Sequence, residues 1–215
     1  MAFSGWQVEA LEFYEGLEAD NSRTYWTTHK AVYDELVYAP MAALLADLEP
    51  QFGHGKIFRP QRDVRFSADK SPYKTAIAAT LEDGGYLQLS AQGLAAGRGM
   101  YQMAPDQLGR YRQAVADDLL GERLVRVVKE IERHGIEVVG RDVLKTAPRG
   151  YPKDHPRIDL LRNKGLIAWQ SWQPEAWLET TAAKDRVVAF LHATLPLNEW
   201  LSTHVGPAQP DDRRP

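Results

Sequence analysis

The segment "TAIAATLEDGGYLQLS", Thr75 to Ser90, decides the fold class of this 215-residue chain. Two short runs, TAIAATL and YLQLS, are separated by the turn-forming residues Asp83-Gly84-Gly85. Strands joined by so short a turn pair antiparallel, so the segment predicts a β-hairpin. Leu87 and Leu89 alternate with polar residues, which gives the second strand one apolar face and one polar face.

The sheet is predicted to continue on both sides of this hairpin. Upstream, Val64 and Phe66 alternate with charged and polar residues, which predicts a strand from Arg62 to Ser67. Downstream, a glycine-containing loop over residues 93–99 is followed by "MYQM", residues 100–103, as a fourth strand. Because parallel neighbours need long crossovers, these closely spaced strands predict a contiguous antiparallel sheet core over residues 56–103.

Helical patterns lie on either side of the predicted sheet. Residues 4–50 form a helical layer whose first helix is expected to be capped by Ser4, and whose last helix begins at Pro40. Residues 105–205 combine helices with the short strand candidates IEVVG, DVLK and GLIAWQSW. We therefore predict one α+β domain over residues 1–205, with a mainly antiparallel sheet, helices packed on one side, and a flexible tail over 206–215.

Composition excludes several classes of protein. There is no cysteine, so neither disulfides nor thiolate chemistry can be present. We find no dinucleotide, P-loop or H-E-x-x-H motif and therefore expect no cofactor and no metal. The sequence pI of about 6.1 argues against nucleic acid as a partner. The N-terminus does not resemble a secretory signal and no run is apolar enough to span a membrane, so we expect a cytoplasmic protein without a membrane partner.

The net charge of −3 conceals a strong segregation of charge. Residues 1–55 carry nine acids and two bases, whereas residues 56–74 carry six bases and two acids. A second basic window, residues 141–164, has seven bases and three acids. Two interpretations stay open: the basic windows meet an anionic ligand, or acidic and basic surfaces neutralise each other within the fold or between molecules of an assembly module without catalysis. The sequence does not decide the oligomeric state.

The first basic window contains all but one of the predicted ligand-binding residues. On the predicted strand, Arg65 shares a polar face with Asp63 and Ser67, beside a neighbouring strand of unusually small residues. An arginine guanidinium above a strand of small side chains can donate two parallel hydrogen bonds. Together with nearby lysines, it suits a small phosphorylated or carboxylated ligand. The alternative is that Arg65 merely pairs with Asp63. The predicted ligand-binding set is Arg62, Arg65, Ser67, Lys70, Tyr73, Lys74 and Arg98.

Three residues are candidates for proton transfer if the protein is a hydrolase or transferase. Asp63 and Asp69 lie beside bases that can tune a carboxylate for this role. His155 lies among polar loop residues and has the side chain suited to acid–base chemistry near neutral pH, although a lone histidine before Pro156 also fits a structural role. Ser67 and Lys70 match an S-x-x-K pattern, but Pro72 leaves no room for the helix that this chemistry needs.

The run "FRPQRDVRFSADKSPYKT", residues 58–75, carries a resemblance to a known family. With "NSRTYWTTHKAVY" before it and "RGYPKDHPRIDLLRNKGL" after it, the chain is similar to a widespread bacterial and fungal family of uncharacterised proteins, a domain of unknown function. The resemblance covers about Val8 to Leu178. It implies a single α+β domain and supplies no catalytic residue, substrate or cofactor, so function has to be argued from the site itself.

Overall fold

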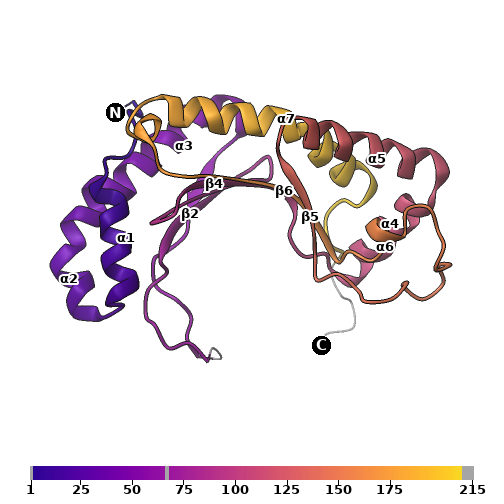
Figure 1. The fold of residues 1–215 in the computed structure, drawn as a ribbon, viewed down its shortest axis with the longest axis horizontal. Coiled ribbons are helices and arrows are strands. Elements are labelled where there is room, and N and C mark those ends of the chain that lie inside the picture. Colours follow the sequence, from indigo (N-terminus) through magenta and orange to yellow (C-terminus); the bar gives the residue numbers. More distant parts are fainter. Residues whose placement is uncertain (1, 66–67, 210–215) are drawn as a thin grey trace. The chain divides into compact units, whose positions relative to one another are not determined.

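The structure, a computed structural model, describes residues 2–65 and 68–209 and has an α+β fold (Figure 1). Six strands form an antiparallel sheet in the order β1-β2-β3-β4-β6-β5, with helices packed against it. The predicted fold class is therefore confirmed. The chain divides into two compact units, Met1–Ala96 with Ser171–Phe190 (unit 1) and Gly97–Gln170 with Leu191–Pro215 (unit 2). The predicted single domain over residues 1–205 stays a prediction.

Unit 1 opens with a helical layer. Helix α1 (Glu9–Ala19) is followed by α2 (Arg23–Val32), the π-helix η1 (Tyr33–Tyr38) and α3 (Ala39–Phe52). Ser22 starts α2 because its hydroxyl accepts a hydrogen bond from the backbone N–H of Tyr25. Helix α3 ends where Gly53 adopts a positive φ. The expected cap at Ser4 is wrong, since α1 begins at Glu9, one full turn later.

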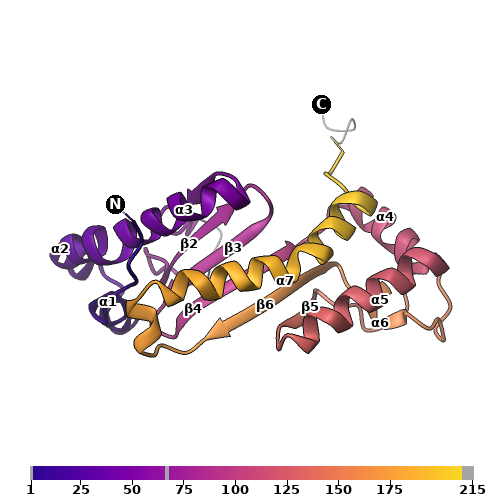
Figure 2. The same cartoon turned by 90° about the horizontal axis from the view of Figure 1, so that it is seen from above.

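The predicted hairpin is confirmed in unit 1. Strand β2 (Ala76–Leu81) pairs with β3 (Gly85–Ser90), and β1 (Gly55–Ile57) pairs with the other edge of β2, all antiparallel. Figure 2 shows α3 and α1 beside these strands. The segment Ala176–Glu179, a short 3₁₀ helix (η2), holds the N-terminal segment, because the N–H of Trp6 donates to the carbonyl of Leu178 at 2.9 Å.

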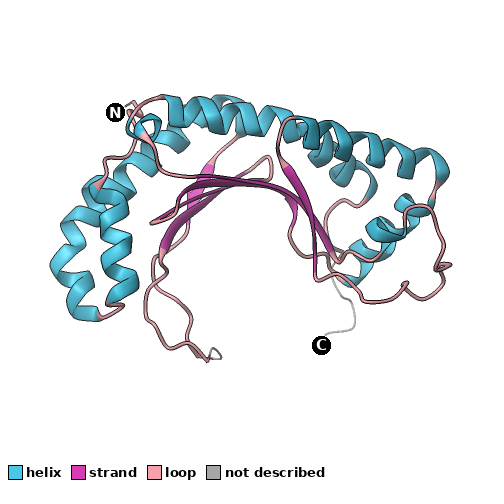
Figure 3. Cartoon of the chain, in the orientation of Figure 1, coloured by secondary structure: helices cyan, strands magenta, loops and turns pink. Residues whose placement is uncertain are grey.

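Two strand predictions in this region are wrong. The chain from Phe58 to Arg65 forms no strand, only an isolated bridge between Gln61 and Tyr73, and Phe66 and Ser67 lie outside the described residues; Figure 3 shows this connection as loop. The segment predicted as a glycine loop is instead strand β4 (Gly93–Met100). This strand ends at Met100, the residue at which the predicted strand over residues 100–103 was expected to begin. The predicted sheet core is therefore interrupted between β1 and β2.

Unit 2 contains α4 (Pro105–Ala116), α5 (Asp118–Arg133), β5 (Glu137–Arg141) and α6 (Ile158–Leu161). Strand β6 (Gly165–Trp172) and helix α7 (Ala182–His204) have residues in both units. The indole N–H of Trp200 in α7 donates to the carbonyl of Leu120 at 3.1 Å, which ties α7 to α5. The strand predicted at "DVLK" is wrong, because residues 142–145 continue as bends and loop.

Within the described ranges, none of the helices combines the length and apolar character that crossing a membrane requires.

Candidate anion-binding site

The strands of unit 1 have two different faces. In β2 and β3, Ala78 lies opposite Gln88 and Thr80 lies opposite Tyr86. Residues directly opposite on paired strands share a face, so these four side chains lie together on what we call the open face. Leu87, on the other face, is fully buried, whereas Thr80, Tyr86 and Gln88 remain partly accessible. The open face is therefore polar and lined by small residues, as the sequence predicted.

The open face carries two lysines. Lys56 of β1 lies opposite Thr80 and so projects from the same face. One residue beyond β1, the N–H of Phe58 donates to the carbonyl of Ala78 at 2.9 Å, which continues the register and puts the Phe58 ring on this face. The ammonium of Lys74 lies 5.4 Å from the centroid of that ring. Neither lysine forms an ion pair with any residue that the structure describes.

Residues 58–75 form a long connection between β1 and β2, here called the basic loop, which projects beyond the end of the strands (Figure 1). Its two arms are held together irregularly: the N–H of Arg62 donates to the carbonyl of Pro72 at 2.9 Å, and that of Lys74 donates to the carbonyl of Pro60 at 2.8 Å. Prolines in both arms lack the N–H that a regular ladder needs, which explains why the alternating pattern does not become a strand.

Tyr73 anchors the basic loop to the helical layer. Its backbone is bonded on both sides by the Asn21 side chain, which accepts from the Tyr73 N–H at 3.0 Å and donates to the Tyr73 carbonyl at 3.1 Å. Its ring is buried and stacks on Trp26 with centroids 4.3 Å apart and planes 8° apart. The predicted ligand-binding residue Tyr73 thus has a packing role, and its ring points into the core of unit 1.

The carboxylates of the basic loop are engaged by its arginines. The Arg65 guanidinium donates to both oxygens of Asp63, at 3.0 Å from Nε and 2.7 Å from Nη2, and Arg62 pairs with Asp69. Hydrogen bonds from Arg65 lower the pKa of Asp63, while hydrogen bonds from Ser71 and then Arg62 lower the pKa of Asp69 to about 2. Carboxylates with lowered pKa values are weak bases, which favours a structural role for both over proton transfer.

The remaining predicted ligand residues are in different environments. Lys70 donates from its ammonium to the carbonyl of Val64 at 2.9 Å, which links the two arms of the basic loop. Ser67 lies outside the described residues. Arg98 of β4 is buried, and its guanidinium donates to the carbonyl of Leu191 in α7, so it holds two elements of unit 2 together.

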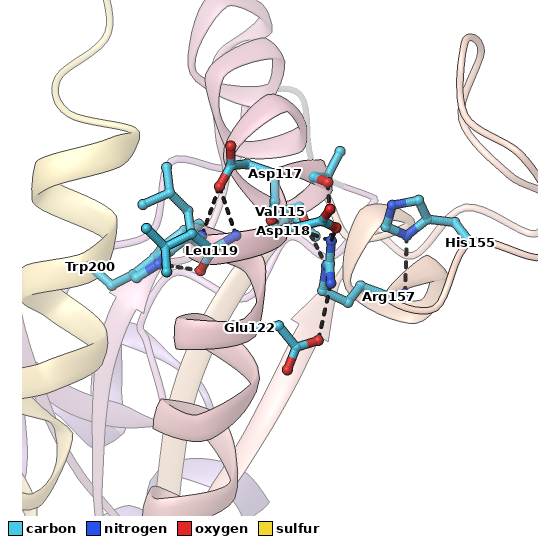
Figure 4. A network of polar contacts seen from close by, with 10 residues as sticks. Val115, Asp117, Asp118, Leu119, Glu122, His155, Arg157 and Trp200 are labelled. Carbon is cyan, nitrogen blue, oxygen red and sulfur yellow. Dashed lines mark hydrogen bonds and ion pairs between the residues drawn. The ribbon is translucent and has the colours of Figure 1, made fainter.

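His155 belongs to a polar network in unit 2, drawn in Figure 4. Its Nδ1 accepts a hydrogen bond from the backbone N–H of Arg157 at 3.0 Å, which in the neutral ring leaves the proton on Nε2. The buried Arg157 guanidinium donates to the carbonyls of Val115, Ala116 and Asp117, where α4 turns into α5. It also pairs with the exposed carboxylates of Asp118 and Glu122, both at 3.1 Å.

The polar face predicted for the hairpin already included Tyr86 and Gln88, because both alternate with Leu87 and Leu89. No face was predicted for Lys56, since the strand was expected only from Arg62 onward. The register of β1 against β2 places Lys56 opposite Thr80, on the open face. Across the described residues, no group of histidine, aspartate and glutamate side chains is arranged to hold a metal ion.

Comparisons with curated proteins and with solved structures found no match. The family model for "Conserved hypothetical protein (DUF2461)" matches residues 9–200, which includes most of both compact units and the basic loop. The chain therefore belongs to DUF2461, a family of conserved hypothetical proteins.

Proposed function

We propose that this protein binds a small phosphorylated or carboxylated ligand on the open face of unit 1. One observation carries the proposal: strand register brings Lys56 and the ammonium of Lys74 to the same small-residue face, and no described acid pairs with either. Lysine offers a compact charge with three donors, which suits phosphate oxygens and carboxylates. Ala78 and Thr80, which share this face with the lysines, have short side chains.

The basic loop supports this role indirectly. Because Asp63 and Asp69 are bonded to Arg65 and Arg62, their charge is compensated locally and does not neutralise the two lysines. Arg62 and Arg65 each already use part of their donors on a carboxylate, so we assign first contact to Lys56 and Lys74. Asp63 and Asp69 shape the loop, and the proposed function is binding rather than proton transfer.

The test is titration calorimetry with inorganic phosphate, pyrophosphate and citrate in about 20 mM salt, where the Debye length is long and exposed charges are weakly screened. We expect at least one of these anions to bind the wild type, and the double variant Lys56→Gln/Lys74→Gln to weaken its binding at least tenfold. The matched control is Lys145→Gln/Lys153→Gln, which removes the same charge from two exposed lysines of unit 2.

Equal weakening in both double variants would mean that the anion responds to overall charge and not to the open face. Absence of heat with all three anions, confirmed by unchanged amide shifts of Thr80 and Gln88 in NMR spectra, contradicts the proposal. Circular dichroism of each variant establishes that it is folded before its affinity is compared.

A further inference from the structure

Helix α5 borders a groove with a strongly basic edge. Exposed bases recur along it at intervals of three or four residues, so they follow one side of the helix. These bases are Arg123, Arg126, Lys129 and Arg133. Together with Val127 and Ile131 of the same helix and Ala193 and Pro196 of α7, they line a groove of about 600 Å³, here called the basic groove.

Most of the charge in the basic groove is uncompensated. Arg133 pairs with Glu130 at 2.7 Å, but Arg123, Arg126 and Lys129 form no ion pair in the part of the chain that the structure describes. The apolar floor formed by Val127 and Ile131 distinguishes this groove from a purely charged surface. A partner that fits it therefore offers both carboxylates and the side of a helix.

The same chain carries a helix with the complementary features. Helix α1 exposes Glu9, Glu12, Glu15 and Glu18, which recur every third residue and which we call the acidic stripe. None of these four forms an ion pair within residues 2–65 and 68–209; Glu18 only accepts hydrogen bonds from the Gln92 side chain at 3.3 Å. Val8, just before α1, is half exposed and adds an apolar contact.

The two helices also match in length. At a rise of about 1.5 Å per residue, the acidic stripe spans about 14 Å and the four bases of α5 span about 15 Å. Glu12 and Glu15 lie close together on one side of α1, with Glu9 and Glu18 at its opposite borders. An antiparallel arrangement therefore aligns Glu15 with Arg126 and Glu12 with Lys129, and it also opposes the two helix dipoles favourably. We propose that the basic groove binds the acidic stripe of a second copy of this chain, so that the protein self-associates through α5 and α1.

Nucleic acid fits the basic groove less well than a second copy does. The chain has a pI of about 6.1 and a net charge of −3, and Glu130 lies among the bases that line the groove. Phosphate backbones attract bases but do not need the apolar floor. The self-association uses neither Lys56 nor Lys74, so it is independent of the anion site on the open face.

The test is sedimentation velocity of the full chain between about 1 and 100 μM, at about 20 mM and 300 mM NaCl. We expect a species larger than the 24.2 kDa monomer at low salt and high concentration, and monomer at high salt, because exposed ion pairs are screened. Two variants each reverse the charge of one contact surface. They are Glu12→Lys/Glu15→Lys in the acidic stripe and Arg126→Glu/Lys129→Glu in the basic groove. Each alone should sediment as a monomer.

Mixing the two variants in equal amounts provides the decisive measurement. The unchanged stripe of one variant then meets the unchanged groove of the other, so association should return, which misfolded variants cannot achieve. The control Glu35→Lys/Glu175→Lys reverses two exposed acids elsewhere and should associate like the wild type. A wild type that is monomeric under all conditions, or a mixture that stays monomeric, overturns the proposal. Co-purified nucleic acid that is lost in the Arg126→Glu/Lys129→Glu variant, without self-association of the wild type, also overturns it.

Discussion

Arg157 shows how a charged side chain in a basic window can serve the fold. Its guanidinium is only 5% exposed and bridges three backbone carbonyls and two carboxylates at the start of α5. Arg162 in the same window donates to the carbonyl of Leu144 at 2.6 Å, and the guanidinium of Arg141 lies 4.4 Å from the Tyr101 ring centroid. Much of the positive charge in residues 141–164 is therefore used inside unit 2.

This network predicts a large effect of Arg157→Ala on stability. The change leaves the carbonyls of Val115 and Ala116 without their donor, and we expect it to lower the free energy of unfolding by about 3 kcal/mol. Urea denaturation measures the change. Arg149→Ala, which truncates an exposed arginine nearby, is the matched control and should stay within about 0.5 kcal/mol of the wild type. Equal effects of the two changes would contradict the assigned role of Arg157.

Asp69 provides a residue-scale prediction about pH. Its folded pKa is about 2, lowered from 3.8 by hydrogen bonds from Ser71 and then Arg62. A carboxyl whose pKa is lower in the folded state stabilises its local structure above the unfolded value and loses this contribution as pH falls. The conformation of the basic loop should therefore be retained at pH 4 and be lost between about pH 4 and pH 2.

A carbon-detected NMR titration of the Asp69 carboxyl measures this pKa directly. We expect a midpoint near 2 in the wild type and a higher one in Ser71→Ala, because the hydroxyl of Ser71 helps to hold the charged form. Asp34 is paired with Lys30 and does not contact Ser71, so it serves as an internal reference in both spectra. A wild-type midpoint at or above 3.8 contradicts the hydrogen bonds assigned to this turn.

Elements with regular periodicity were predictable from the sequence, and those stabilised by close backbone approach were not. The hairpin of residues 75–90 was predicted because its turn residues and its buried leucines agree. Strand β4 was not predicted, because its glycines are typical of a loop. In the structure these glycines are needed: a Cβ at Gly97 would lie 2.8 Å from the Trp169 ring, and one at Gly99 would lie 2.4 Å from the Leu166 carbonyl oxygen.

The basic loop shows the opposite error. Alternation of Val64 and Phe66 with charged residues resembles a strand, but period two alone does not show which partner supplies the hydrogen bonds. Here Asn21, 52 residues away, bonds the backbone of Tyr73 in place of a neighbouring strand. The polar composition of the candidate site was thus predictable, whereas its location on the open face depends on a register that only the structure provides.

The anchoring of the basic loop predicts the effect of Asn21→Ala. The change removes the side-chain acceptor of the Tyr73 N–H and the side-chain donor to the Tyr73 carbonyl. These half-buried backbone groups then lack partners, so we expect a loss of about 1–3 kcal/mol in the free energy of unfolding. Amide exchange of Tyr73 should become faster than in the wild type. Gln51→Ala, at an exposed position of α3, is the control and should change neither quantity. Unaltered exchange at Tyr73 in Asn21→Ala would mean that other contacts hold the loop.

Two glycines in different elements should respond in opposite directions to substitution by alanine. Gly5 has φ of +106°, and a Cβ there would lie 2.2 Å from the backbone of Glu179, so Gly5→Ala should cost about 3 kcal/mol or more. Gly109 lies within α4 with nothing within 4 Å of an added Cβ, so Gly109→Ala should stabilise by up to about 1 kcal/mol. Thermal denaturation measures both, and a destabilised Gly109→Ala would contradict the open environment described for that position.

At the scale of the whole molecule, neither compact unit is a continuous stretch of chain. The boundaries fall after Ala96, Gln170 and Phe190, within β4, β6 and α7 respectively. Unfolding of one unit therefore removes part of each of these three elements from regular structure. Helices and paired strands form cooperatively, so the part that remains is destabilised as well. We expect the chain to unfold in a single transition, as the predicted single domain requires.

Fluorine NMR of the protein labelled with 5-fluorotryptophan tests this expectation, because buried tryptophans report on each unit separately. Trp6 lies in unit 1 and Trp200 in unit 2, and both are at most 1% exposed. Their signals, assigned through Trp6→Phe and Trp200→Phe, should lose intensity over the same range of urea concentration. The control is the labelled protein monitored by far-UV circular dichroism, whose midpoint should coincide with both. Separate midpoints for Trp6 and Trp200 would show that the units unfold independently, and that β4, β6 and α7 do not couple them.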